Sequence, residues 1–160
     1  MREYRKVGSV RRIGMLGLGV AVALPLLSIG ETRGEDYKLK IPFGLEESAV
    51  VIPADNPLTK EKVELGRLLF FDKRLSQDNT IACANCHVAK FAFTDGKPVS
   101  TGIRGQKGGR SAPASFNRVF SSVQFWDGRA PDVEAQAKGP ILNPVEMAMP
   151  NAAAVIRRLR

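Results

Sequence analysis

The chain has 160 residues, the length of one ordinary domain. It has 24 Lys and Arg against 16 Asp and Glu, and hydrophobic residues make up 44%, which argues against a fully disordered chain. Two cysteines and one histidine exclude a multi-disulfide scaffold, an all-cysteine zinc site and a histidine-rich metal centre.

The N-terminal segment 1–30 has the pattern of an export signal. A basic region precedes an uncharged apolar run, 13–29, and the small residues Ser28 and Gly30 suit a cleavage site. The run is short for a membrane span and contains Pro25, so a cleaved signal peptide at 1–30 is favoured over an uncleaved membrane anchor.

The charge of the remaining chain is moderate. The segment 1–30 holds five basic residues and one acidic residue, so it carries +4 of the total +8 and leaves +4 on 31–160. This part has no run of basic residues interleaved with aromatic ones, so no nucleic-acid partner is expected.

The helical part of the sequence begins after a leader or linker at 31–52. Asn56 is expected to cap a helix that starts at Pro57 and ends at Phe70 and Phe71. The helical spacing of four leucines predicts one apolar face on it: Leu58, Leu65, Leu68 and Leu69.

The rest of the chain is expected to be short helices and long loops. Residues 81–90 could form two helical turns, and the glycine-rich stretch 94–123 is predicted to be irregular. A loop of that length either wraps a site or ligand or is a disordered insert. A short helix is predicted over 131–138, stopped by Gly139 and Pro140, and another over 151–160. No strand alternation is present, so the fold class is all-α with long irregular loops.

Both cysteines and the histidine lie in one motif, Cys83-Ala84-Asn85-Cys86-His87. This is the C-x-x-C-H signature of covalent c-type haem attachment, in which two thiols on one helical turn bind the porphyrin and the histidine binds the iron. The alternatives are a disulfide or redox pair and a zinc site. Haem is favoured because no βαβ pattern accompanies the motif and three adjacent ligands seldom surround a zinc ion.

The sixth iron position is open to two interpretations. Met147 and Met149 follow His87 at a separation that suits the methionine ligand of a mono-haem electron-transfer cytochrome with His/Met ligation. The methionines could equally be core residues, which would leave the iron open to water or peroxide.

From Leu65 onward the sequence resembles the N-terminal part of the bacterial di-haem cytochrome c peroxidases. The matching stretches are LGRLLFFDKRLS (65–76), CANCH (83–87), GGRSAP (108–113) and QFWDGRAPDVEAQAKGPILNPVEM (124–147). The resemblance implies a cytochrome c-like haem domain, with one covalent haem c at which hydrogen peroxide is reduced in the periplasm. It also implies electrons from a cytochrome c-type donor and a second haem domain or chain, since the family has two C-x-x-C-H motifs and this chain has one. Residues 53–160 are accordingly expected to be a peroxidase haem domain truncated at its C-terminus.

The resemblance also assigns roles to individual residues. Cys83 and Cys86 match the thioether cysteines, and His87 matches the proximal iron ligand. Glu146 matches the distal acid/base that moves a proton between the peroxide oxygens, and Gln136 matches the distal amide beside it.

Three further positions carry expectations. Trp126 matches the tryptophan between the two haems, although on its own it would be read as a core residue with a bonded N–H. Arg129 is expected to be structural or a partner of a haem propionate. Ser111 stands where the family has a calcium-ligating asparagine, so it departs from the calcium-binding pattern. The loop 100–110 also lacks the histidine that family members usually carry there.

Overall fold

The computed structural model describes residues 34–160, which form one unit. The predicted signal peptide at 1–30 therefore lies outside the described residues. Residues 34–59 are extended chain and turns, with one short 3-10 turn, η1, at Glu47–Ala49. The segment is tied to the start of the first helix, because Tyr37 N–H donates to Leu58 O (3.1 Å) and Lys60 N–H donates to Glu35 O (2.9 Å).

The first helix, α1, spans Lys60–Phe71 and begins later than predicted. Thr59 is its N-cap, and its side chain accepts a hydrogen bond from Lys62 N–H at 3.3 Å. Asn56 does not cap the helix because its side chain is used elsewhere: it donates to Glu134 and accepts from Lys62. The prediction that α1 starts at Pro57 is therefore wrong.

The predicted apolar face of α1 is only partly inward. Leu69 and Phe70 line a central cavity, whereas Leu65 and Leu68 are each 54% exposed and Leu58 precedes the helix. Helical spacing identified the apolar residues correctly, but it does not show which side of the helix meets the rest of the protein.

After α1 the chain forms short turns around the haem motif. These are the 3-10 turn η2 at Lys73–Leu75, the one-turn helix α2 at Cys83–Cys86, and the 3-10 turn η3 at Ala89–Phe91. The side chain of Asn85 accepts a hydrogen bond from Ala82 N–H at 2.8 Å, which closes the start of α2. α1 packs against α2.

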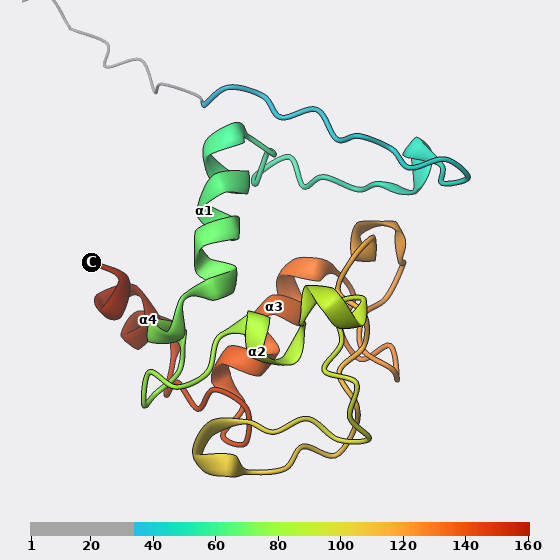
Figure 1. Cartoon of the computed structure of the whole chain (residues 1–160). Coiled ribbons are helices and arrows are strands. Elements are labelled where there is room, and N and C mark those ends of the chain that lie inside the picture. The colour runs from blue at the N-terminus through green and yellow to red at the C-terminus, as the bar shows by residue number, and fades with distance from the viewer. Residues whose placement is uncertain (1–33) are drawn as a thin grey trace, which may run out of the picture. The chain divides into compact units, whose positions relative to one another are not determined.

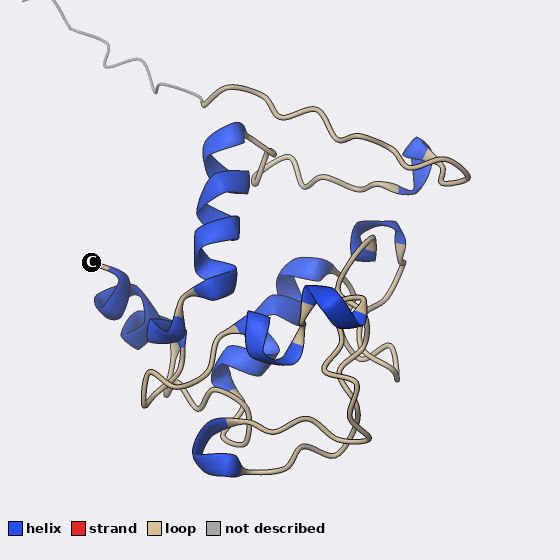
Figure 2. Cartoon of the chain, viewed as in Figure 1, coloured by secondary structure: helices blue, strands red, loops and turns tan. Residues whose placement is uncertain are grey.

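The stretch 94–123 is irregular, as predicted, apart from the 3-10 turns η4 at Ile103–Gly105 and η5 at Arg118–Phe120. Figure 1 shows it as the long yellow-to-orange path between α2 and α3. Many of its residues line the central cavity, so it wraps a site and is not a disordered insert. Within residues 34–160 no strand is assigned, and Figure 2 shows only helices joined by loops, which confirms the all-α prediction.

Helix α3 spans Val133–Leu142 and continues through the predicted stop. Pro140 lies in its last turn, where it removes one hydrogen bond of the helix but does not end it. Gly139 serves packing, because a Cβ there would lie 3.1 Å from the Phe125 ring. The prediction that Gly139 and Pro140 end the helix is wrong for these reasons. Helix α4, Ala152–Leu159, follows the prediction, with Asn151 accepting from Ala154 N–H at 2.9 Å.

α4 contacts η2, and Arg158 of α4 also binds the segment that follows η2. The Arg158 guanidinium donates to Ser76 O (2.6 Å), Gln77 O (2.6 Å) and Asn79 Oδ1 (2.9 Å). These bonds join the end of the chain to the loop that leads into α2.

Replacing Arg158 with methionine should lower the free energy of unfolding by about 2 kcal/mol, because two backbone carbonyls lose a charged donor while the apolar stem is kept. Urea unfolding of the variant measures the change. Arg157→Met, at the exposed neighbouring position, is the control and should shift the midpoint far less. Equal midpoints for the two variants would contradict a structural role for Arg158.

Candidate functional site

A cavity of about 810 Å³ lies among α1, α2, α3 and the 94–123 loop. It is within the size range of small-molecule and cofactor pockets. All six residues to which the family resemblance assigned a haem-binding or catalytic role line it: Cys83, Cys86, His87, Trp126, Gln136 and Glu146. The structure therefore brings together residues that lie far apart in the sequence.

The two cysteines are positioned by the single turn of α2. Cys83 and Cys86 are three residues apart and so lie on the same side of the helix, and both are free thiols that line the cavity. Burial raises the pKa of each thiol. The pair can therefore present two sulfur atoms to one bound group.

His87 follows α2 and is oriented by a backbone carbonyl. Its Nδ1 lies 3.0 Å from Phe93 O. That carbonyl returns to the ring because Ala92 and Phe93 both have a left-handed backbone, with φ of 55° and 57°. With Nδ1–H donating to the carbonyl, Nε2 keeps its lone pair for a metal, the arrangement found around metal-ligating histidines.

Glu146 lies on the turn between α3 and α4 and is half-buried in the same cavity. Asn143 Nδ2 donates to its Oε1 at 2.8 Å. Burial raises the pKa of the Glu146 carboxyl, while Arg129, the Asn143 bond and His87 partly oppose this effect. Glu146 is therefore not the solvated carboxylate of a helix start, and its environment is that of a group that can exchange a proton.

Gln136 and Trp126 enter the cavity from different elements. Gln136 lies in α3, and Trp126 lies in the turn before it. The Trp126 side chain donates from Nε1 to Ser111 O at 2.9 Å and is 63% exposed. Trp126 is thus not a core residue: it lines the cavity and also reaches the surface.

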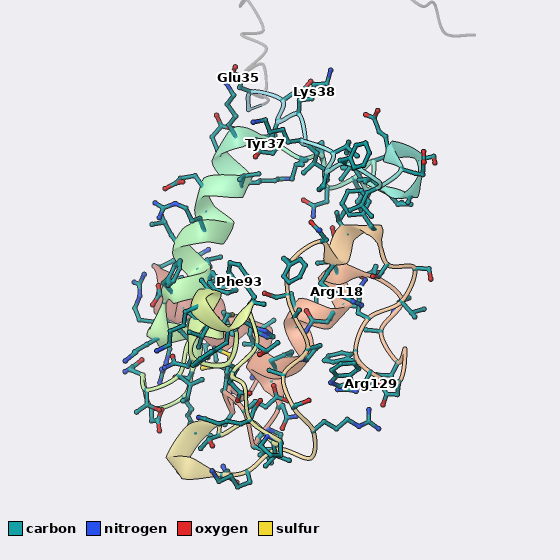
Figure 3. The ribbon with its side chains drawn as sticks, turned by 45° about the vertical axis from the view of Figure 1, so that its right-hand side comes forward. Glu35, Tyr37, Lys38, Phe93, Arg118 and Arg129 are labelled. Carbon is teal, nitrogen blue, oxygen red and sulfur yellow. The ribbon has the colours of Figure 1, made fainter. Side chains whose placement is uncertain are left out.

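Sequence reasoning missed part of the cavity wall. Arg110 and Arg118 line it together with Arg129, and Figure 3 shows Arg118 and Arg129 on the opposite side of the view from α1. Asp127 pairs with Arg110 (2.7 Å) and Arg129 (2.8 Å), and these two bonds lower the pKa of Asp127 to about 2. Arg110 and Arg118 could have been identified from the sequence, because they are basic residues in the 94–123 loop, for which one prediction was that it wraps a ligand.

The two candidate methionine ligands are both buried, at 3% exposed for Met147 and 2% for Met149. Met147 lines the cavity beside Glu146. Met149 belongs to the small apolar core, together with Leu75 and Ile103.

The calcium expectation stays a prediction. The backbone carbonyl of Ser111 accepts the Trp126 hydrogen bond, and residues 34–160 contain no cluster of three or more His, Cys, Asp or Glu side chains that could hold a metal.

The residues present fit a covalently attached haem. Two thiols and a histidine with one free ring nitrogen lie on one wall of a cavity of cofactor size. Arginines on the wall suit the carboxylates that haem carries. The all-α fold and this cavity are those of a c-type haem domain.

Comparison with known proteins agrees with this class. The family model "Di-haem cytochrome c peroxidase" matches residues 60–160, and the chain belongs to that family. It is 42% identical to the cytochrome c peroxidase Ccp of Escherichia coli K12, over 82% of this chain and 29% of that protein. It is 50% identical to the cytochrome c551 peroxidase of Pseudomonas aeruginosa, over 57% of this chain and 26% of that protein.

Two solved structures of related proteins also match this chain. A MauG-like protein associated with microbial copper homeostasis matches 78% of this chain and 36% of its own, at 35% identity and a TM-score of 0.69. The diheme peroxidase BthA from Burkholderia thailandensis matches 69% of this chain and 32% of its own, at 28% identity and a TM-score of 0.57. The chain therefore spans about a quarter to a third of the length of these relatives. Within the described residues, no helix is long and apolar enough to cross a membrane.

Proposed function

We propose that the chain is the peroxide-reacting haem domain of a cytochrome c peroxidase, which reduces hydrogen peroxide to water with electrons from a small c-type cytochrome. The observation that carries the proposal is that Glu146 and Gln136 line the same cavity as Cys83, Cys86 and His87. The family's haem c cofactor and the peroxidase names of the relatives support it.

Cys83 and Cys86 would hold the haem by thioethers, and His87 Nε2 would bind its iron. When bound, the haem supplies a ferric iron that can bind one oxygen of peroxide and that can be oxidised and reduced. The Phe93 carbonyl fixes the His87 ring and increases the basicity of Nε2.

Glu146 would carry the proton transfer. As a carboxylate it would accept a proton from one oxygen of the peroxide and return it to the other, so that this second oxygen can leave as water. With two electrons and two further protons the second oxygen also becomes water. Asn143 holds the carboxylate through Oε1 and leaves Oε2 for the substrate. Gln136 would orient the peroxide through its side-chain amide.

The competing function is an electron carrier with Met147 on the iron, since Met147 lines the cavity. The optical spectrum of the ferric haem-loaded chain distinguishes the two. A peroxidase should be high-spin and react with peroxide, whereas a carrier should show the weak long-wavelength band of methionine ligation and no reaction. A methionine band without peroxide reactivity would overturn the proposed function.

Trp126 is proposed to relay electrons, because it both lines the cavity and is 63% exposed. Trp126→Phe should lower steady-state oxidation of a reduced small c-type cytochrome while leaving the single-turnover reaction with peroxide unchanged. Stopped-flow and steady-state rates measure the two steps separately. Equal loss in both would show that Trp126 acts on the cavity and not on electron entry.

The proposal places the protein in the periplasm, after removal of the signal peptide at 1–30, with a second haem domain or chain as electron partner. The di-haem family model supports that partner, as does the diheme peroxidase BthA, of which this chain covers 32%. Intact-mass analysis of periplasmic material, expected to lack residues 1–30, tests the signal peptide.

A further inference from the structure

The loop 100–107 contacts both sides of the proposed reaction site. At one end, Thr101 O lies 4.0 Å from Cys86 Sγ. At the next residue, Gly102 lies against the turn that carries Glu146. The loop therefore spans the distance between the haem-attachment side and the proton-transfer residue.

The contact at Gly102 admits no side chain. Gly102 is buried, and a Cβ there would lie 2.7 Å from Glu146 Cα and 2.8 Å from Glu146 O, with Val145 O closer still. These neighbours are backbone atoms, so they cannot swing aside as a flexible side chain would. Its backbone is extended, at φ −98°, so close approach is the reason for glycine here.

Hydrogen bonds fix the loop to the same turn. Ile103 N–H donates to Glu146 O at 2.8 Å, and Gln106 Nε2 donates to Pro144 O at 3.1 Å. Gly102 N–H donates to Gln106 O at 2.8 Å, which closes the loop on itself. The Ile103 side chain is fully buried, so it anchors the loop in the core.

We infer that the loop 100–107 is a positioning device that sets the place of the Glu146 carboxylate relative to the haem, with Gly102 and Gln106 as its positioning residues. The inference rests on the proposed function, since it assigns these residues a role only through Glu146. The loop holds the Glu146 carbonyl by a hydrogen bond and lies against Glu146 Cα, so a side chain at Gly102 would push apart the loop and the turn that carries the carboxylate.

The test uses the haem-loaded chain in a double-mutant cycle of Gly102→Ala and Glu146→Gln. Gly102→Ala should slow peroxide cleavage by about tenfold or more, because displacement of a reacting group by a fraction of an ångström is costly. In the Glu146→Gln background the same change should have little further effect, because both act through one carboxylate.

Cyanide binding gives a second readout without turnover. Hydrogen cyanide binds ferric haem as the anion, so a nearby base must take its proton. Gly102→Ala should slow cyanide association in the wild-type background and much less in the Glu146→Gln background. The haem content by mass should stay at that of the parent chain.

A second pair of variants leaves Gly102 unchanged, so its result does not depend on whether Gly102→Ala folds. Gln106→Met removes the donor to Pro144 O, whereas Lys107→Met removes a donor that bonds only Thr101 Oγ1 within the loop. Gln106→Met should slow cyanide association and Lys107→Met should not.

Equal effects of Gly102→Ala in both Glu146 backgrounds, or equal effects of the two methionine variants, would overturn this inference and leave the proposed function standing. If the Glu146→Gln variant cleaves peroxide at the wild-type rate, Glu146 is not the acid/base, and the inference about the loop is contradicted as well.

Discussion

Replacing both Cys83 and Cys86 with serine is expected to leave no covalently bound haem on the chain. The two thiols lie on the same side of α2 and line the cavity, and a hydroxyl cannot form the thioether. Intact-mass spectrometry after maturation in a host that attaches c-type haem measures the result. The parent chain should weigh one haem more than its polypeptide, and the double variant should match the polypeptide mass.

Two controls sharpen this experiment. Each single cysteine variant should keep one thioether and retain some covalent haem. Ala89→Ser, at an exposed position just after the motif, should keep the full haem content. Covalent haem on the double variant, or a parent chain with only its polypeptide mass, would remove the basis of the haem assignment.

Glu146→Gln is expected to slow peroxide cleavage by about 10²-fold or more, the contribution of a well-placed general acid/base. The substitution keeps the size of the side chain and an oxygen for the Asn143 bond, but it removes the group that accepts a proton. Stopped-flow mixing of ferric haem-loaded protein with peroxide measures the step directly. The control is Glu47→Gln, an exposed glutamate in η1, which should react at the parent rate.

The pH dependence gives an independent check on Glu146. Because burial raises its pKa, the parent chain should lose its cleavage rate on acidification at a higher pH than an ordinary glutamate would give. The carboxylate is the reactive form, so the rate falls as the pH decreases through that raised pKa. Glu146→Gln should lack this step. A parent profile that is flat through the acidic range would contradict the role of Glu146 as the base.

The local chemistry could be predicted from the sequence because it is contained in short motifs. The C-x-x-C-H spacing implies two sulfurs on one helical turn, and α2 has that form. The long irregular loop was also predictable, since its glycines and prolines disfavour regular structure. The roles of Glu146, Gln136 and Trp126 came from family resemblance, and the structure adds that they line one cavity.

The errors arose where long-range contacts override local preference. Asn56 is a good capping residue, yet its side chain bonds Glu134, 78 positions away, and Thr59 caps α1 instead. Gly139 and Pro140 are a typical stop signal, but the Phe125 ring needs the space that Gly139 provides and α3 continues. The clash at Gly102 could not be predicted either, because the turn it meets lies much further along the chain, beyond α3.

None of the helices α1 to α4 contains a fully buried residue, and the middle of this unit is a cavity of about 810 Å³. Its apolar core is small, with Leu75, Ile103 and Met149 among the buried residues, whereas a densely packed interior stabilises most domains. The proposed haem would therefore add to this core as well as serve as the reaction centre. Folding and cofactor maturation would then be a single event, and a chain that failed to acquire its haem would be a ready substrate for proteases.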